Sequence, residues 1–217
     1  MSVQRGLRPE FYRARLVRDL HARGIPTPIC EALGRIPRHE FAGKGWDLEQ
    51  AYADITLPIG YGQTISQPYV VARMTQLLLD ECQRRCVLEV GTGCGYQTAV
   101  LAALCERVYS VERIKSLADS ARARLQQLGI LRVYTQHGDG FAGWPQQAPF
   151  DGIVVTAAAA QVPPALIQQL AIGGRLVMPV GEPGSQILMT IDRADDQTLR
   201  VGRFDPVTFV PLLPELE

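Results

Sequence analysis

The chain has 217 residues, with 22 Lys and Arg against 22 Asp and Glu and 47% hydrophobic residues, a composition typical of a soluble globular protein. This composition excludes a disordered chain and collagen, and the formal net charge of zero argues against stable binding to nucleic acid. The length suits one α/β domain with additions, so we expect one main hydrophobic core.

The sequence also predicts a cytoplasmic protein. Its first residues carry several arginines but no continuous apolar run, and nowhere do about 18 apolar residues run together as a membrane-spanning helix requires. The odd number of cysteines, without paired zinc-binding spacings, fits a reducing compartment. These cysteines are Cys30, Cys82, Cys86, Cys94 and Cys105. The three histidines share no metal-binding spacing, so we expect no metal: they are His21, His39 and His137.

The first third of the chain predicts two helices and a long loop. Residues 9–24 begin at a proline, end at a glycine and carry apolar residues at helical spacing, which predicts an amphipathic helix. A second short helix is expected over residues 28–33. Residues 41–66 lose all periodicity and are punctuated by Gly and Pro, which predicts a long loop of the kind that is often functional.

From residue 68 onward, apolar strands alternate with helices, which is typical of a parallel sheet covered on both faces. The expected helices cover residues 69–80, 96–105, 112–129 and 163–171, and the expected strands cover 84–90, 107–111, 131–137, 150–158 and 173–181. Three further strands, over 186–193, 198–204 and 207–213, follow without helices between them and predict antiparallel neighbours. We therefore expect a doubly wound, mostly parallel α/β fold, with a helical segment and loop over residues 1–66 and a core over 67–217 that form one compact domain.

A glycine-rich turn follows the first strand of this core. Gly91, Gly93 and Gly95 lie between a buried strand and a helix, where the backbone must turn sharply and can approach a ligand. The spacing is G-x-G-x-G, whereas dinucleotide-binding turns have G-x-G-x-x-G, so a nicotinamide or flavin cofactor is disfavoured. A purely structural turn is the alternative.

Acidic residues near the ends of successive strands sharpen the expectation. Glu112 follows the glycine turn by about 20 residues, where a carboxylate can bind ribose hydroxyls. Asp139, beside Gly140, could accept from an adenine amine, and Glu89 is a buried carboxylate that a cationic ligand amine would balance. For Glu112 or Asp139 alone, a solvated loop residue or a cap is the alternative. Together they describe a site for an adenosine-bearing, positively charged, phosphate-free molecule, which fits S-adenosylmethionine.

At this point the sequence resembles the protein-L-isoaspartate O-methyltransferase family, from about residue 24 almost to the C-terminus. The resemblance is carried by IPRHEF, AYADITLPIGYGQTISQPYVVARMTQLL, VLEVGTGCGYQTAVLAAL, SVERI, HGDG, APFDGIVVTAA, GGRLVMPVG and FVPL. GYGQTISQPY is its most family-specific part. The resemblance implies a seven-stranded, Rossmann-like methyltransferase sheet. It also implies transfer of a methyl group from S-adenosylmethionine to the free α-carboxylate of L-isoaspartyl residues in damaged proteins.

The resemblance also assigns site residues. It implies that Ser66 is the active-site serine and that Thr64, Ile65 and Gln67 border cofactor and substrate. It further implies that Gly91, Gly93 and Gly95 hold the methionine end, Glu112 the ribose, and Asp139 with Gly140 the adenine. Asp54 and Thr156 are weaker candidates for substrate contacts. The alternatives are a helix N-cap for Ser66, a loop cap for Asp54 and a structural hydroxyl for Thr156.

Two departures and two alternatives accompany this interpretation. Cys94 stands in the glycine turn where many relatives have serine, and Leu213, after FVPL, offers no hydroxyl for a polar contact. The alternatives are a methyltransferase of another acceptor and a cofactor-binding protein that recognises damaged proteins without catalysis. We expect damaged proteins and peptides as partners, no nucleic acid, no membrane and a monomer, the last because no long apolar strip remains uncovered.

Overall fold

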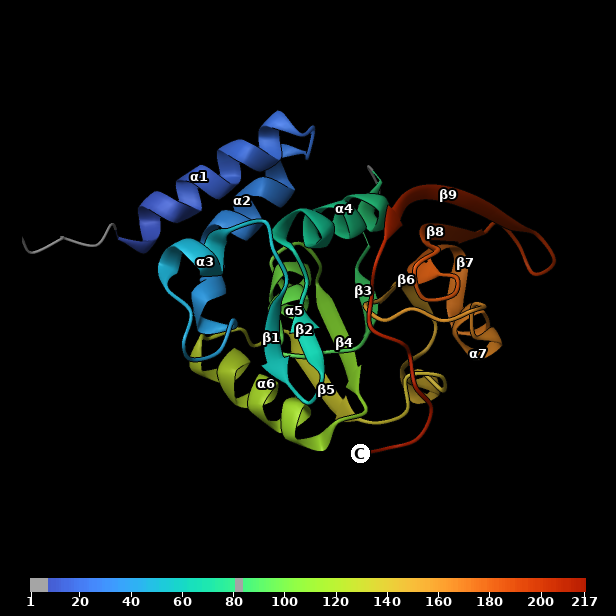
Figure 1. Cartoon of the computed structure of the whole chain (residues 1–217). Helices are drawn as coiled ribbons and strands as arrows, with labels where there is room; N and C mark the ends of the chain where they lie inside the picture. Colours follow the sequence, from blue (N-terminus) through green and yellow to red (C-terminus); the bar gives the residue numbers. More distant parts are fainter. Residues whose placement is uncertain (1–7, 81–83) are drawn as a thin grey trace, which may run out of the picture.

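The computed structural model describes residues 8–80 and 84–217, so Cys82 and the first seven residues lie outside the described part. The two predicted N-terminal helices are confirmed as α1 (Pro9–Ala22) and α2 (Thr27–Arg35). They pack on each other and bury Leu16 and Leu20 of α1 in the same hydrophobic cluster as Leu33 of α2. Figure 1 shows them stacked outside the main body of the fold, beyond α4.

The stretch predicted as a long loop has regular structure, so that prediction was wrong in part. A short helix, α3 (Leu48–Tyr52), begins with a capping box in which Asp47 and Gln50 bond each other's backbone N–H. An antiparallel hairpin follows, with β1 (Leu57–Gly60) and β2 (Gln63–Ile65). Its turn places Tyr61 at a φ of 54° between two glycines. The short strands fall below the length at which period-two alternation is visible in a sequence.

A seven-stranded sheet in the order β5-β4-β3-β6-β7-β8-β9 forms the centre of the molecule. β3 to β7 run parallel, whereas β8 pairs antiparallel with β7 and β9 pairs antiparallel with β8, as the helix-free ending of the sequence predicts. The strands are β3 (Cys86–Val90), β4 (Arg107–Glu112), β5 (Val133–His137), β6 (Phe150–Val155), β7 (Leu170–Val180), β8 (Gln186–Arg193) and β9 (Leu199–Val207). The strand expected over 207–213 is absent, because β9 itself runs to Val207 and the chain beyond it makes only a single bridge, between Pro211 and Ala158.

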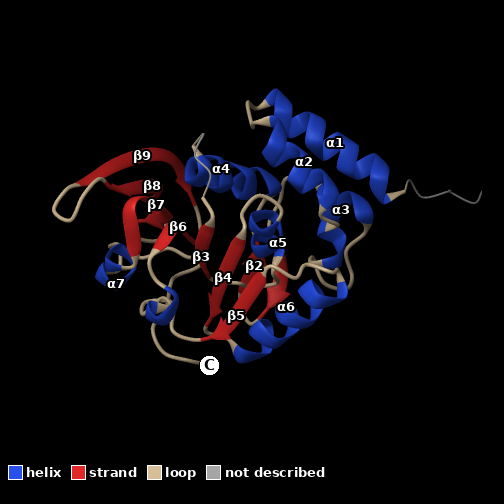
Figure 2. Ribbon diagram, turned by 180° about the vertical axis from the view of Figure 1, so that it is seen from behind, coloured by secondary structure: helices blue, strands red, loops and turns tan. Residues whose placement is uncertain are grey.

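Helices cover both faces of this sheet (Figure 2). They are α4 (Pro68–Leu79), α5 (Tyr96–Ala102), α6 (Lys115–Gln127) and α7 (Pro164–Gln168). Val87 and Val108 pack with α4 and α5, whereas Leu88 and Tyr109, one residue further along the same strands, pack with α7. Alternate residues of a strand point to opposite faces, so each central strand is buried on both sides and reads as a continuous apolar run.

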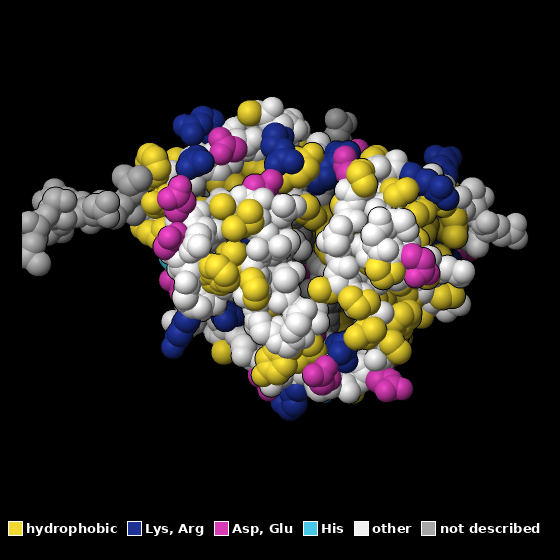
Figure 3. Space-filling view, in the orientation of Figure 1, with side chains coloured by type: hydrophobic (Ala, Val, Ile, Leu, Met, Phe, Trp, Pro, Cys, Tyr) yellow, Lys and Arg dark blue, Asp and Glu magenta, His cyan; other side chains and the backbone are white. Residues whose placement is uncertain are grey.

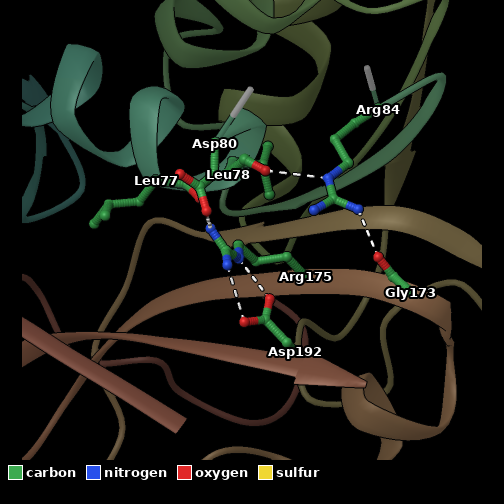
Figure 4. A network of polar contacts seen from close by, with 7 residues as sticks. All are labelled: Leu77, Leu78, Asp80, Arg84, Gly173, Arg175 and Asp192. Carbon is green, nitrogen blue, oxygen red and sulfur yellow. Dashed lines mark hydrogen bonds and ion pairs between the residues drawn. The ribbon is translucent and has the colours of Figure 1, made fainter. Parts of the chain in front are cut away.

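At the edge of the sheet opposite the carboxyl ends of the parallel strands, a polar clamp joins α4 to the sheet (Figure 4). The Arg175 guanidinium donates to both carboxylate oxygens of Asp192, at 2.5 and 2.9 Å, and to the main-chain oxygen of Leu77 at 3.0 Å. Arg84 donates to the main-chain oxygens of Leu78 and Gly173. The carbonyl groups at the end of α4 thus receive donors that the helix cannot supply itself.

No helix in the described residues is long and apolar enough to cross a membrane.

Candidate active site

A cavity lies where the carboxyl ends of the parallel strands meet the N-terminal hairpin. The turn after β3, the end of β4, the turn at Gly140, the hairpin and the chain over 210–213 all contribute to its lining. In a doubly wound sheet this is the edge at which ligands bind. Eight predicted site residues line it: Thr64, Ile65, Ser66, Gly91, Gly93, Glu112, Gly140 and Thr156.

The glycine turn lets the backbone form one wall of this cavity. Gly91 has a φ of 96°, and a Cβ at that position would stand 2.3 Å from the Thr156 hydroxyl, which donates to the main-chain oxygen of Gly91. Gly93 also has a positive φ, of 53°. Gly95 does not line the cavity, and a Cβ there would contact Ala121 and Leu125 of α6. The first two glycines therefore shape the wall, whereas the third has room for a Cβ and is favoured as glycine by its φ of 91°.

Glu112, at the end of β4, is 6% exposed and points at the glycine turn. Its Oε2 accepts from the Gly93 N–H at 2.8 Å, and its Oε1 accepts from the Ile114 N–H at 3.0 Å. Each carboxylate oxygen keeps a further lone pair, so both can still accept hydrogen bonds from a ligand in the cavity. The carboxylate thus joins the first two strand ends and remains available to vicinal hydroxyl groups.

Glu89 is fully buried in β3 and does not line the cavity. Its Oε2 accepts from the hydroxyls of Thr98 and Ser110, each at 2.5 Å, and its Oε1 has no partner among the described residues. Burial raises the pKa of Glu89 to about 8 against the opposing effect of the two hydroxyls, so the carboxyl is protonated at neutral pH. Strand alternation turns this side chain towards α5, which explains why it contacts hydroxyls where a ligand amine was expected.

Hydrogen bonds nevertheless connect the buried Glu89 carboxyl to the lining of the cavity. The Ser110 hydroxyl lies 2.6 Å from that of Thr92, and Thr92 belongs to the glycine turn that lines the cavity. Glu89, Ser110 and Thr92 therefore form a hydrogen-bonded chain from the sheet interior to the turn.

The C-terminal segment over residues 210–213 passes the end of β6 and forms one side of the cavity. The Ala158 N–H donates to the Val210 carbonyl, and the Leu212 N–H donates back to the Ala158 carbonyl. Leu212 and Leu213 line the cavity with apolar atoms. Asp139 lies next to Gly140 but outside the lining, and its Oδ1 accepts from the Phe141 N–H at 2.8 Å. This carboxylate is half-buried, and its Oδ2 makes no hydrogen bond with the described residues.

A second cavity adjoins the first, on the side of β8 and β9. It is lined by Thr56, Gln67, the turn at Ser185 and the chain over 206–210. Three predicted residues, Thr64, Ser66 and Thr156, line both cavities and therefore stand at the neck between them. Figure 3 shows the molecule hollowed near the centre of this face, where most atoms are not those of charged side chains. Two reactants held in the two cavities would meet at this neck.

Ser66 is not the N-cap of α4, which was the alternative to its role as the active-site serine. The N-cap of α4 is Gln67, without a side-chain cap, and the capping carboxylate comes from Asp54, whose Oδ1 accepts from the Tyr69 N–H at 2.9 Å. Asp54 lines neither of the two joined cavities. The Ser66 hydroxyl, free of hydrogen bonds to the rest of the described chain, remains available to a ligand at the neck.

Several lining residues were not predicted. Arg113 and Ile114 directly follow Glu112, and Thr92, Tyr96 and Gln97 surround the glycine turn, so their nearness in sequence was a usable signal. Cys94 is among the lining residues, and burial raises the pKa of its thiol, which disfavours the reactive thiolate. The approach of residues 210–213 depends on the path of the chain after β9, which no local pattern specifies.

Comparison with known proteins gives one consistent result. Residues 12–217 match the family model of protein-L-isoaspartate(D-aspartate) O-methyltransferase. Two similar curated proteins are the protein-L-isoaspartate O-methyltransferases of Alcanivorax borkumensis and Halorhodospira halophila. The first is 52% identical over 200 residues, which are 92% of this chain and 90% of that protein. The second is 51% identical over 209 residues, which are 96% of this chain and 94% of that protein.

Solved structures agree with this result. A protein-L-isoaspartate O-methyltransferase superposes with a TM-score of 0.84 at 28% identity, over 94% of this chain and 67% of that one. A putative enzyme of this kind from Plasmodium falciparum, solved with S-adenosyl-L-homocysteine, has the same fold, with a TM-score of 0.80 at 24% identity over 93% of this chain and 98% of that one.

Proposed function

The chain belongs to the protein-L-isoaspartate(D-aspartate) O-methyltransferase family, and from that premise we propose how its two joined cavities carry out the reaction. The protein transfers the methyl group of S-adenosylmethionine to the free α-carboxylate of L-isoaspartyl residues in damaged proteins. The resulting methyl ester converts through a succinimide, part of which hydrolyses to normal aspartate. The observation that carries our assignment of roles is the neck, where Ser66 borders both cavities.

The first cavity fits the cofactor. Its wall at Gly91 has no room for a Cβ, which would meet the Thr156 hydroxyl, and its lining holds the Glu112 carboxylate with two lone pairs to spare for ribose hydroxyls. No cationic cluster for a pyrophosphate is needed, because this cofactor carries no phosphate. We propose that Gly91 and Gly93 hold the methionine end, Glu112 the ribose, and Gly140 with Asp139 the adenine.

We propose an indirect role for Glu89 and Gly95. Glu89 supports the glycine turn through Ser110 and Thr92, as a neutral carboxyl rather than as the partner of an amine. Gly95, with a φ of 91°, lets the turn lead directly into α5. Both residues thus shape the cofactor cavity from behind its lining.

The second cavity suits the acceptor. S-adenosylmethionine supplies an electrophilic methyl group on a positively charged sulfonium. The acceptor carboxyl has a pKa near about 3.5 and is ionised at neutral pH, so the residues at the neck need to position it and need not remove a proton. We propose that the Ser66 hydroxyl donates to this carboxylate, and that Thr64, Ile65, Gln67 and Thr156 fix the reactants in line on either side. Charge is lost as the bond forms, and the half-buried neck favours that loss.

The test is methyl transfer from labelled S-adenosylmethionine to a matched peptide pair, one with L-isoaspartate and one with normal aspartate. We expect base-labile label on the isoaspartyl peptide alone. Label on both peptides, or on neither while the cofactor binds, would contradict the assigned acceptor.

Three further expectations remain proposals. We propose that the N-terminal segment over residues 1–66 and the core over residues 67–217 form one compact domain. A monomeric state and a cytoplasmic location are proposed from the sequence, and sedimentation and cell fractionation would test them.

A further inference from the structure

The N-terminal helix α1 lines neither reactant cavity, yet Arg23 at its C-terminal end bonds Asp54, just before the hairpin of β1 and β2. The helix stops in a tight turn, in which the N–H groups of Arg23 and Ile25 both donate to the carbonyl of Leu20. Gly24 follows with a φ of 79°. Leu20 is buried, so this turn fixes the backbone of Arg23 against the core.

Arg23 makes two contacts with the elements that flank the hairpin. Its Nη1 lies 2.6 Å from Asp54 Oδ2, just before β1. Its guanidinium carbon stands 3.2 Å from the centre of the Tyr69 ring, in the first turn of α4. A planar guanidinium can make an ion pair along its edge while its face stacks on an aromatic ring, which an ammonium group does less well.

Asp54 completes the connection. Its Oδ1 accepts from the Tyr69 N–H at 2.9 Å, and its main-chain oxygen accepts from Gln67 Nε2 at 3.0 Å. The segment between Asp54 and Gln67 is the hairpin with Thr64, Ile65 and Ser66. Both ends of this segment are therefore tied to each other, and Arg23 stacks over the tie.

We infer that Arg23 is a positioning residue for methyl transfer, which locks the base of the hairpin over residues 54–69 and so holds Ser66 at the neck between the cavities. This inference rests on the proposed function and adds a residue from the N-terminal helix to it. The lock acts mostly on the acceptor side, because Gln67, the lining residue that bonds Asp54 directly, lines the second cavity and not the first. The glycine turn and Glu112 of the first cavity are held by a hydrogen bond to each other.

The lock is open to solvent, so its components can be replaced without disturbing the core. The side chains of Arg23 and Asp54 are 45% and 40% exposed. A separate cavity beside them is lined by Tyr12, Arg15, Asp19 and Glu49 as well, and there Arg15 pairs with both Asp19 and Glu49. An exposed ion pair and a helix cap are each modest in strength, which leads us to expect a change of about 3- to 10-fold rather than complete loss.

The experiment compares Arg23→Gln, Asp54→Asn and the double variant with Arg18→Gln, an exposed arginine of the same helix. We expect the first two to lower kcat/KM for an isoaspartyl peptide by about 3- to 10-fold, through KM more than kcat. The cofactor Kd should change less than about 2-fold, and Arg18→Gln should behave as wild type. The double variant should lose little more than either single one, since both break the same lock. Arg23→Lys should restore part of the loss.

A second readout keeps the inference separate from the proposed function. Hydrogen exchange at the Tyr69 amide and over residues 57–66 should be faster in Arg23→Gln than in Arg18→Gln. This expectation holds whether or not the protein methylates isoaspartyl peptides. Wild-type protein inactive on isoaspartyl peptide would overturn the proposed function alone. Unchanged exchange, a kcat/KM equal to that of Arg18→Gln, or a parallel loss of cofactor affinity would overturn the lock.

Discussion

Replacing Glu89 by glutamine should remove the part of the pH dependence of the unfolding free energy that comes from titration of this side chain. The side chain is fully buried, keeps hydroxyl partners on one oxygen and has none for the other. At neutral pH it is a protonated acid, because burial raises its pKa from 4.5 to about 8. Glutamine has nearly the same shape, carries no charge at any pH and can still accept from Thr98 and Ser110.

The magnitude follows from linkage. Below about pH 4.5 the carboxyl is protonated in both states, so stability is highest there as far as this group is concerned. As the pH rises, the unfolded chain releases the proton while the folded one keeps it, and the free energy of unfolding falls by up to about 1.4 kcal/mol per pH unit. The fall ends near pH 8, where the folded carboxyl also ionises. Between about pH 6 and pH 8 the loss is about 2 kcal/mol.

The assay is urea-induced unfolding of wild type and Glu89→Gln at several pH values. The difference in unfolding free energy between them should shift by about 2 kcal/mol in favour of the variant from about pH 6 to pH 8, and then level off. Glu182→Gln, at an exposed position, is the control and should show no such shift. A difference that stays constant with pH, or that moves in favour of wild type, would refute a buried neutral carboxyl.

Three other substitutions test separate parts of the structure. Ser66→Ala should lower kcat by about 10- to 100-fold with cofactor binding nearly unchanged, since it removes one hydrogen bond to a charged group, and wild-type turnover would contradict the role given to the hydroxyl. Gly91→Ala should weaken cofactor binding more than about 10-fold by calorimetry, because its Cβ would meet the Thr156 hydroxyl at 2.3 Å and its φ is 96°; unchanged affinity would mean that the turn does not form the wall. Arg175→Met should cost about 2 kcal/mol of unfolding free energy while kcat/KM stays within about 2-fold, because the clamp to Asp192 lies at the edge of the sheet opposite the carboxyl ends of the parallel strands; a loss of activity without a loss of stability would be the opposite result.

The fold was predictable from the sequence because its central strands read as apolar runs that alternate with helices long enough to show their period. Residues 186–193 were predicted as a strand, and β8 has the same bounds. The hairpin before Ser66 was not predicted, because its strands of four and three residues are set by tertiary contact rather than by local pattern.

Some parts of the candidate site could likewise be predicted from the sequence, and others could not. The glycine turn and Glu112 could be placed from spacing alone, since a strand end fixes where the next residues lie. The partners of Glu89 could not, because Thr98 and Ser110 come from a helix and a neighbouring strand whose side-chain directions depend on packing. The capping of α4 by Asp54 was equally hidden, since 15 residues and a hairpin separate the carboxylate from the amide that it binds.

The narrow passage at Thr64, Ser66 and Thr156 has a consequence for which damage is repaired first. If the second cavity takes the acceptor as we propose, an isoaspartyl carboxylate reaches that passage when the chain on both sides of it leaves its own fold and lies along the cavity. The rate for a folded client is then the rate for a free peptide multiplied by the fraction of time that the client's segment is unfolded. A site open in about one molecule in a hundred is methylated about a hundredfold more slowly than the same sequence in a peptide. Damage in mobile loops is thus cleared early, and damage inside helices and sheets waits for local unfolding of the client.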